Sequence, residues 1–299
     1  MNNGPFFSVI IPTYNRADFI EKTLRSVLSQ EFNDFEVIVV DDGSTDNTGE
    51  IIASFNDQKI RYYKNNNSER GASRNFGGQL AKGKYVNFFD SDDLLLPNHL
   101  MTAYKFIFEN DSPEVFHLNF DIRDENGKLI KGPIMLKGDL NLKLVKEGNF
   151  LSCNGVFIRK DIFFSNRFSE VRELSASEDH ELWLRLAARY PINYTNAVTS
   201  SILQHEHRSV LKFDRSAIIT RMELFIDHIF NDKHFVEKYG RYKNLMIAHT
   251  FTYIALHASL TGRDRTTTIL YLLKAIKKNP KVIFTKRYFV TLLKILTIH

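Results

Sequence analysis

The feature that most constrains the fold is a short apolar run, Tyr85 to Phe89, that ends in the acids Asp90, Asp92 and Asp93. Its β-forming residues, bounded by Gly83 and by turn residues, predict a buried strand whose carboxyl end opens into a cleft. Three carboxylates so close together repel one another unless a cation or water balances them, and oxygen ligands suit Mg²⁺ or Mn²⁺. Taken alone, the run is equally compatible with a solvated acidic turn that caps the following helix.

Strands and helices alternate along the first part of the chain. Apolar runs at residues 6–12, 36–40 and 60–63 read as further strands, and helical spacing of apolar residues follows the first two. This order predicts an α/β fold with a mostly parallel, Rossmann-like sheet covered by helices on both faces. An Asn126-Gly127 turn after a strand-like run at 114–122 predicts that antiparallel strands join the sheet. Beyond about residue 210 only helices are expected.

Composition sets the class of protein. The 299 residues are 43% hydrophobic and 25% charged, which is typical of a globular core domain with a smaller appendage. A single cysteine, Cys153, cannot form an intramolecular disulfide and favours a reducing, cytoplasmic setting. We expect neither a secretion signal nor a transmembrane helix, because the start lacks a basic segment and no run of eighteen apolar residues occurs.

Polar clusters follow three of the predicted strands. Thr13-Tyr14-Asn15 follows the first, Asp41-Asp42-Gly43-Ser44 the second, and the acidic cluster the fourth. In parallel sheets ligands bind outside the carboxyl ends of the strands, so one nucleotide cleft explains all three positions. Tyr14 can stack on a base, while Thr13 and Asp41 offer polar groups to its edge. The alternative for Asp42 and Ser44 is that they cap the second helix.

Five segments in this order resemble the family 2 glycosyltransferases of the GT-A fold, over residues 6–210. They are Ser8 to Asn15, Val39 to Asp46, Gly71 to Asn75 with Ala81 to Tyr85, Phe89 to Asp93, and Ser177 to Asp179. The resemblance implies a catalytic domain at 1–210 and a helical region at 211–299. It also implies an inverting, metal-dependent transfer of a sugar from a nucleotide diphosphate-sugar, a UDP-sugar in our interpretation. The acceptor would be a glycan or lipid-linked oligosaccharide in cell-surface polysaccharide synthesis.

The same resemblance assigns roles to single residues. The expected donor contacts are Pro12, Thr13, Tyr14, Asn15, Asp41, Arg74, Asp90 and Ser91. The expected ligands of Mn²⁺ or Mg²⁺ are Asp92, Asp90 and His207, with His205 as the alternative histidine and Asp93 as a supporting contact. Arg74 would pair with the diphosphate or the base edge. A surface ion pair is the alternative for Arg74.

Asp179 is the predicted catalytic base. An inverting displacement needs an ionised carboxylate that takes the proton of the acceptor hydroxyl. Asp179 lies at the start of a predicted helix, where the helix dipole favours the ionised form. The alternative is that Glu178 and Asp179 only complement that dipole.

The excess positive charge of the chain lies in its tail. Residues 261–299 contain nine Lys and Arg and one acid, a net charge of +8, whereas the preceding 260 residues contain 31 basic and 34 acidic residues. Apolar residues recur at helical spacing among these lysines, a pattern that binds anionic bilayer surfaces. Packing of the helices on the core, with lysines outward, is the alternative. The expected location is cytoplasmic and, through the tail, peripheral on the inner membrane face; no nucleic-acid partner is expected.

Two other functions are open to such a sheet. A sugar-nucleotide nucleotidyltransferase resembles chains with a glycine-rich loop after the first strand, and Pro12 to Asn15 is not such a loop. A non-catalytic nucleotide-sugar-binding member of the fold is the second alternative. The presence of both Asp92 and Asp179 argues against it.

Overall fold

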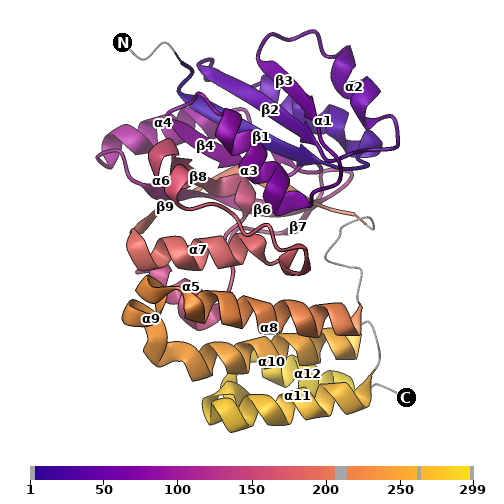
Figure 1. The fold of residues 1–299 in the computed structure, drawn as a ribbon, viewed down its shortest axis with the longest axis vertical. Helices are drawn as coiled ribbons and strands as arrows, with labels where there is room; N and C mark the ends of the chain where they lie inside the picture. The colour runs from indigo at the N-terminus through magenta and orange to yellow at the C-terminus, as the bar shows by residue number, and fades with distance from the viewer. Residues whose placement is uncertain (1–3, 206–213, 261–263, 297–299) are drawn as a thin grey trace. The chain divides into compact units, whose positions relative to one another are not determined.

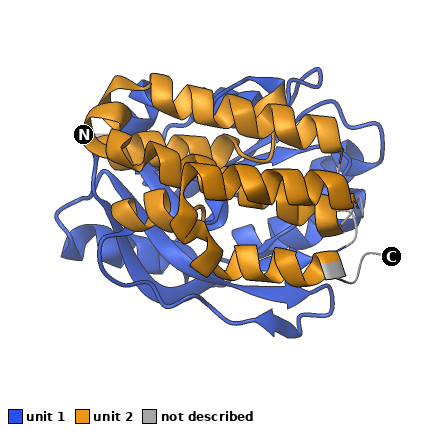
Figure 2. Ribbon diagram, turned by 90° about the horizontal axis from the view of Figure 1, so that it is seen from below, with its two compact units in different colours: residues 1–140, 151–172, 190–206 blue, residues 141–150, 173–189, 207–299 orange. Residues whose placement is uncertain are grey.

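The chain divides into two compact units (Figure 2). The computed structural model describes residues 4–205, 214–260 and 264–296. The sheet unit comprises residues 1–140, 151–172 and 190–206, and the helical unit comprises 141–150, 173–189 and 207–299. Both units are therefore built from segments that alternate along the sequence. The division of the catalytic and C-terminal regions at residue 210 stays a prediction.

One twisted sheet organises the sheet unit (Figure 1), and the described residues form it in the order β3-β2-β1-β4-β8-β6-β9-β5, with β7 paired to β6. Its strands are β1 (Phe7–Thr13), β2 (Phe35–Asp41), β3 (Ile60–Lys64), β4 (Tyr85–Phe88), β5 (Leu94–Leu95), β6 (Val115–Asp124), β7 (Leu129–Lys131), β8 (Val156–Arg159) and β9 (Ile192–Gln204). β1 to β4 are mutually parallel, and β8 joins them antiparallel. The predicted α/β fold with a mostly parallel sheet is confirmed.

Helices cover both faces of this sheet, as predicted. The helices are α1 (Ala17–Leu28), α2 (Thr48–Ser54), α3 (Arg70–Leu80), α4 (His99–Glu109) and α6 (Lys160–Ser165). Alternate β1 residues, Val9 among them, join one buried cluster with apolar residues of α1 and α4. The intervening Ile10 faces α3, where a Cβ on Gly77 would lie 2.5 Å from the Ile10 side chain. Glycine thus lets α3 approach the sheet closely.

The strand order places a switch point at β1. β2 lies on one side of β1, with Thr13 opposite Asp41, and β4 on the other, with Ile10 opposite Phe88. Because these strands are parallel, the loops that follow them leave from one edge of the sheet. This is the edge at which doubly wound sheets bind ligands.

The second half of the sheet differs more from the sequence-based expectation. The turn at Asn126-Gly127 joins β6 and β7 antiparallel, as predicted. β9, in contrast, was not predicted, although it runs parallel to β6 from Ile192 to Gln204 with irregularities near Asn119. Its polar middle, Asn193 to Thr199, lacks the strict alternation that marks a strand.

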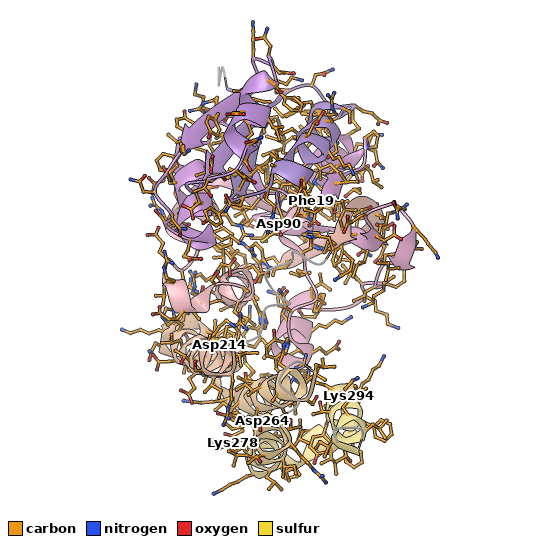
Figure 3. All side chains as sticks on the ribbon, turned by 90° about the vertical axis from the view of Figure 1, so that its right-hand side faces the viewer. Phe19, Asp90, Asp214, Asp264, Lys278 and Lys294 are labelled. Atoms are coloured by element: carbon orange, nitrogen blue, oxygen red, sulfur yellow. The ribbon has the colours of Figure 1, made fainter. Side chains whose placement is uncertain are left out.

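The helical unit contains α5 (Leu140–Glu147), α7 (Glu178–Arg189), α8 (Arg215–Asn231), α9 (Lys233–Tyr239), α10 (Lys243–Leu260), α11 (Arg265–Lys278) and α12 (Lys286–Leu296). Three of these helices begin at aspartate N-caps, Asp214, Asp232 and Asp264 (the first and last are labelled in Figure 3), whose carboxylates accept backbone N–H groups of the first turn. Among the described residues, no helix has the length and apolar character needed to cross a bilayer.

Candidate active site

The loops after β1 and β2 are joined to each other. Asn15 adopts a left-handed backbone (φ 49°), and its side-chain oxygen accepts from the Thr45 N–H at 2.9 Å. The Asn15 N–H donates to Ser44 Oγ at 2.9 Å, and Asp41 Oδ1 accepts from the Ser44 N–H at 2.7 Å. These bonds fix the loop after β1 that is predicted to bind the nucleobase. Tyr14 lies at the tip of this loop, with 44% of the tyrosine surface exposed.

Two further predicted donor contacts come from β1 itself. Pro12 and Thr13 are buried, and Thr13 lies opposite Asp41 in the parallel register. The Thr13 hydroxyl makes no hydrogen bond within the described part of the chain. A buried hydroxyl without a protein partner costs free energy, so a ligand or water is needed there.

The two acids after β2 have different roles. Asp41 Oδ2 accepts from the Tyr62 hydroxyl at 2.7 Å, and burial together with this carboxylate raises the pKa of Tyr62. Asp42 accepts from the backbone N–H groups of Ser68 and Glu69 at 2.7 and 2.8 Å, directly before α3. The alternative that Asp42 caps the second helix is therefore wrong. Asp42 instead orders the entry to α3, which leaves Asp41 as the acid beside the base-binding loop.

Arg74 and Asp90 form a buried ion pair. The Arg74 Nη2 donates to Asp90 Oδ1 at 2.8 Å, and only 1% of the arginine surface is exposed. The guanidinium lies 5.2 Å from the ring centroid of Phe168. The alternative of a surface ion pair for Arg74 is wrong because the side chain is enclosed by α3 and this ring. The neighbouring Ser91 is also buried, and its carbonyl accepts from the Thr23 hydroxyl at 3.0 Å.

Asp92 is held by a second arginine that the sequence reading missed. Asp92 Oδ2 accepts from Arg16 Nε at 3.2 Å and lies 3.1 Å from His205 Nε2. The His205 ring is packed on Phe19, with ring centroids 4.2 Å apart (Phe19 and Asp90 are labelled in Figure 3). The position of Arg16, directly after Tyr14-Asn15, was the available signal. His207, the histidine we predicted as a ligand, lies outside the described residues.

The Asp92 and His205 pair fits a divalent cation. The observed 3.1 Å is a hydrogen-bond distance, and it also matches the separation of about 3 Å between adjacent ligands of an octahedral cation with bonds of about 2.1 Å. A carboxylate oxygen with an imidazole nitrogen suits Mn²⁺. No group of three candidate side-chain ligands occurs among the described residues. Phosphate oxygens and water would complete the coordination, as is common for phosphate-bound cations. Direct ligation by Asp90 stays a prediction.

Asp93 has a structural role instead. Its side chain is fully buried, its Oδ2 accepts from Asn154 Nδ2 at 2.7 Å, and its Oδ1 accepts from the Leu203 N–H at 2.8 Å. Asp93 therefore ties the end of β4 to β9 and to the turn before β8. The three neighbouring acids thus differ in their hydrogen-bond partners.

The predicted catalytic base, Asp179, lies in the helical unit. Asp179 is the second residue of α7, where its Oδ1 accepts from the His180 N–H at 2.7 Å and its Oδ2 accepts from Asn149 Nδ2 at 3.2 Å. Its side chain is half-buried, whereas that of Glu178 is buried. Hydrogen bonds to a carboxylate stabilise its ionised form, which a general base requires. The role of Asp179 as base stays a prediction.

Known structures and sequences define the class. The structure of S. aureus TarS residues 1–349 with UDP-GlcNAc superposes with a TM-score of 0.63 at 18% identity, covering 92% of each chain. The mannosyltransferase PcManGT of Pyrobaculum calidifontis, with GDP-Man and Mn²⁺, gives 0.59 at 15% identity over 99% of this chain and 85% of its own. The fold is thus that of the GT-A glycosyltransferases. Residues 8–170, more than half of the chain, match the model of glycosyl transferase family 2, and the chain belongs to this family.

Sequence relatives add detail. Three Rickettsia proteins named uncharacterized glycosyltransferases are 32 to 34% identical over 61 to 64% of this chain, but the matches span only 26 to 31% of their own length. The putative colanic acid biosynthesis glycosyl transferase WcaA of Escherichia coli is 28% identical over 69% of this chain and 75% of its own.

The partners of Asp92 and Asp93 predict that the same substitution destabilises the protein to different extents. Asp93→Asn places an amide N–H₂ against one of two buried donors and should lower the free energy of unfolding by about 2 to 4 kcal/mol. Asp92→Asn, whose partner Arg16 is partly exposed, should lower it by about 1 kcal/mol or less. Urea unfolding of the two variants measures this difference. Equal losses of unfolding free energy in the two variants would show that Asp92 and Asp93 do not differ in this way.

Proposed function

We propose that the protein is an inverting, metal-dependent glycosyltransferase that moves a hexose from a UDP-sugar to a glycan or lipid-linked acceptor. The observation that carries the proposal is the convergence of the Asn15 loop, the Arg74 and Asp90 pair and the Asp92 and His205 pair at one edge of the parallel sheet. Family membership and the resemblance to WcaA support a role in cell-surface polysaccharide synthesis. The UDP-GlcNAc bound to TarS supports a uridine nucleotide, while GDP-Man in PcManGT is the competing choice.

The donor-binding residues each contribute a separate interaction. Tyr14 stacks on the base, and the Thr13 hydroxyl and the Asp41 carboxylate contact its polar edge. Asp90 accepts from a ribose hydroxyl while Arg74, already paired with it, donates to the diphosphate. Asp92 and His205 hold Mn²⁺ or Mg²⁺, which when bound neutralises the charge that develops on the departing nucleoside diphosphate.

Asp179 takes the proton of the acceptor hydroxyl while the oxygen of that hydroxyl attacks the anomeric carbon of the sugar. The bond to the diphosphate oxygen breaks in the same displacement, so the configuration of the sugar inverts. The bonds from Asn149 and from the His180 N–H orient the carboxylate.

The tail supports binding to an anionic membrane surface. One face of α11 and α12 is buried in the helical unit, including Leu272 and Ile295. Large apolar residues of α11, of α12 and of the 3₁₀ turn between them are exposed, with Leu273 60%, Phe284 85% and Phe289 58% exposed. The same stretch of chain carries exposed lysines, including Lys278 and Lys294 (labelled in Figure 3). Exposed aromatic residues among lysines are typical of shallow burial in an anionic bilayer.

Donor binding tests the proposal first. UDP with Mn²⁺ should raise the melting temperature, because a ligand at 100 times its Kd stabilises by about 2.7 kcal/mol. Asp92→Asn should abolish the Mn²⁺-dependent part of the shift. Asp18→Asn, the same change at an exposed position of α1, is the control and should leave it unchanged. Stabilisation by no nucleoside diphosphate would contradict the proposal.

The base assignment has its own test. Asp179→Asn should keep the UDP and Mn²⁺ melting shift but slow UDP release from UDP-GlcNAc by about 10² to 10⁴ fold, since proton transfer is lost while donor contacts remain. Asp227→Asn, at an exposed position of α8, is the matched control. Turnover retained in Asp179→Asn would refute the assignment.

Vesicle sedimentation tests the tail. The double variant Phe284→Ser and Phe289→Ser should bind phosphatidylglycerol vesicles at least tenfold more weakly than the parent chain, because two aromatic side chains no longer enter the bilayer. Met135→Ser, an equally exposed apolar position of the sheet unit, should bind like the parent. Unchanged binding of the double variant would refute the role of this surface.

A further inference from the structure

Two partly buried arginines of the helical unit lack a carboxylate partner within the described residues. Arg221 of α8 donates through Nη1 to the carbonyl of Ser175 at 3.1 Å, and its Nε is buried without a hydrogen bond in the same part of the chain. Arg287 of α12 donates through Nη1 to the carbonyl of His249 at 3.3 Å. Both side chains keep part of their surface exposed, so a ligand can reach them.

Other arginines of this unit are neutralised in the usual way. Arg189 pairs with Asp232 at 2.7 Å, and Arg215 pairs with Asp264 at 2.9 Å. The hydrogen bonds of Arg221 and Arg287 to backbone carbonyls explain how the two side chains pack. They do not explain why neither arginine is paired with a carboxylate. A guanidinium stays charged in proteins, so the two together create a local excess of positive charge.

Met222 and Tyr288, the chain neighbours of the two arginines, belong with Tyr253 to one apolar cluster, which offers no negative charge. The Arg287 guanidinium lies 5.7 Å from the ring centroid of Tyr253, and the ring of Tyr253 lies 4.3 Å from that of His257. Burial, then the charges of Arg221 and Arg287, lower the pKa of His257, and burial with Arg287 lowers the pKa of His180 to about 3. Both imidazoles are therefore neutral near pH 7.

Asp179 lies within electrostatic reach of the same group. Burial raises the pKa of Tyr253, both arginines lower it, and the charge of Asp179 raises it. Arg221 is also bonded to Ser175, four residues before Asp179 on the approach to α7. Arg221 thus lies on the approach to the helix whose second residue, Asp179, the proposed function uses as base, and the His180 ring packs on Phe225 of the same α8 with ring centroids 4.9 Å apart.

We propose that Arg221 and Arg287 form a phosphate-binding site that holds a phosphate group of the acceptor close to the hydroxyl that Asp179 deprotonates. Guanidinium groups bind phosphate through charge-assisted, bidentate hydrogen bonds. A lipid-linked diphosphate and a phosphodiester within a polymer share this chemistry. The inference rests on the proposed function, because only the role of Asp179 connects the site to an acceptor.

Glycerol 3-phosphate is a suitable probe, titrated by calorimetry into the full chain saturated with UDP and Mn²⁺ so that the donor side is filled. Arg221→Gln and Arg287→Gln should each weaken its binding about tenfold or more, since each removes charge-assisted hydrogen bonds. Arg221→Lys and Arg287→Lys keep the charge and should recover part of the affinity. Arg215→Gln, a paired arginine of the same unit, is the control and should bind like the parent.

The possible outcomes separate the two proposals. An unchanged UDP and Mn²⁺ melting shift in Arg221→Gln and Arg287→Gln, with lost glycerol 3-phosphate binding, supports the site. Equal glycerol 3-phosphate affinity in all variants, or none in the parent chain, overturns it. If UDP fails to bind the parent chain, the proposed function fails, and the same titration without nucleotide still tests the arginines. Loss of phosphatidylglycerol vesicle binding without any effect on glycerol 3-phosphate would assign the arginines to a lipid headgroup and overturn the acceptor role.

Discussion

The parallel register of β1 between β2 and β4 is the constraint on which the donor side of the site depends. It sets Thr13 opposite Asp41 and Ile10 opposite Phe88, so the loops that follow these strands leave from one edge. Strand direction alone would bring the loops close, but their hydrogen bonds fix them. The bonds of Asn15 to the β2 loop hold one side of the cleft, and the bond from Arg16 to Asp92 joins it to the other.

Like-charge repulsion at the end of β4 is relieved by partners from three directions. Arg74 comes from α3 to Asp90, Arg16 comes from the start of α1 to Asp92, and amide donors enclose Asp93. The chain thus pairs these acids with cations and amide donors rather than burying them unpaired, which would be costly. In the proposed function, a bound diphosphate would give the two guanidinium groups a second anionic partner. Such a ligand would contact the partners of both Asp90 and Asp92.

Much of this edge was predictable from the sequence because strand ends and polar clusters are local patterns. The pairing of Arg16 with Asp92 was not, since the two residues lie 76 positions apart and no local pattern joins them. The separate roles of Asp92 and Asp93 were equally hidden, because the donors that decide them lie 61 and 110 positions from Asp93. β9 escaped prediction because tertiary pairing with β6, rather than side-chain alternation, defines it.

The helical unit shows how pairing, rather than charge count, identifies functional cations. The tail has the highest net charge of the chain, but most of its lysines lie on the solvent side of α11 and α12, where screening makes single charges weak. Arg221 and Arg287 are fewer and partly buried, and no carboxylate among the described residues is bonded to them. In a low-dielectric setting each uncompensated charge has a stronger effect than several exposed ones. A phosphate bound there would gain more electrostatic free energy from the two arginines than from the larger number of exposed lysines. We therefore assign specific recognition to the arginines and attraction to a charged surface to the lysines.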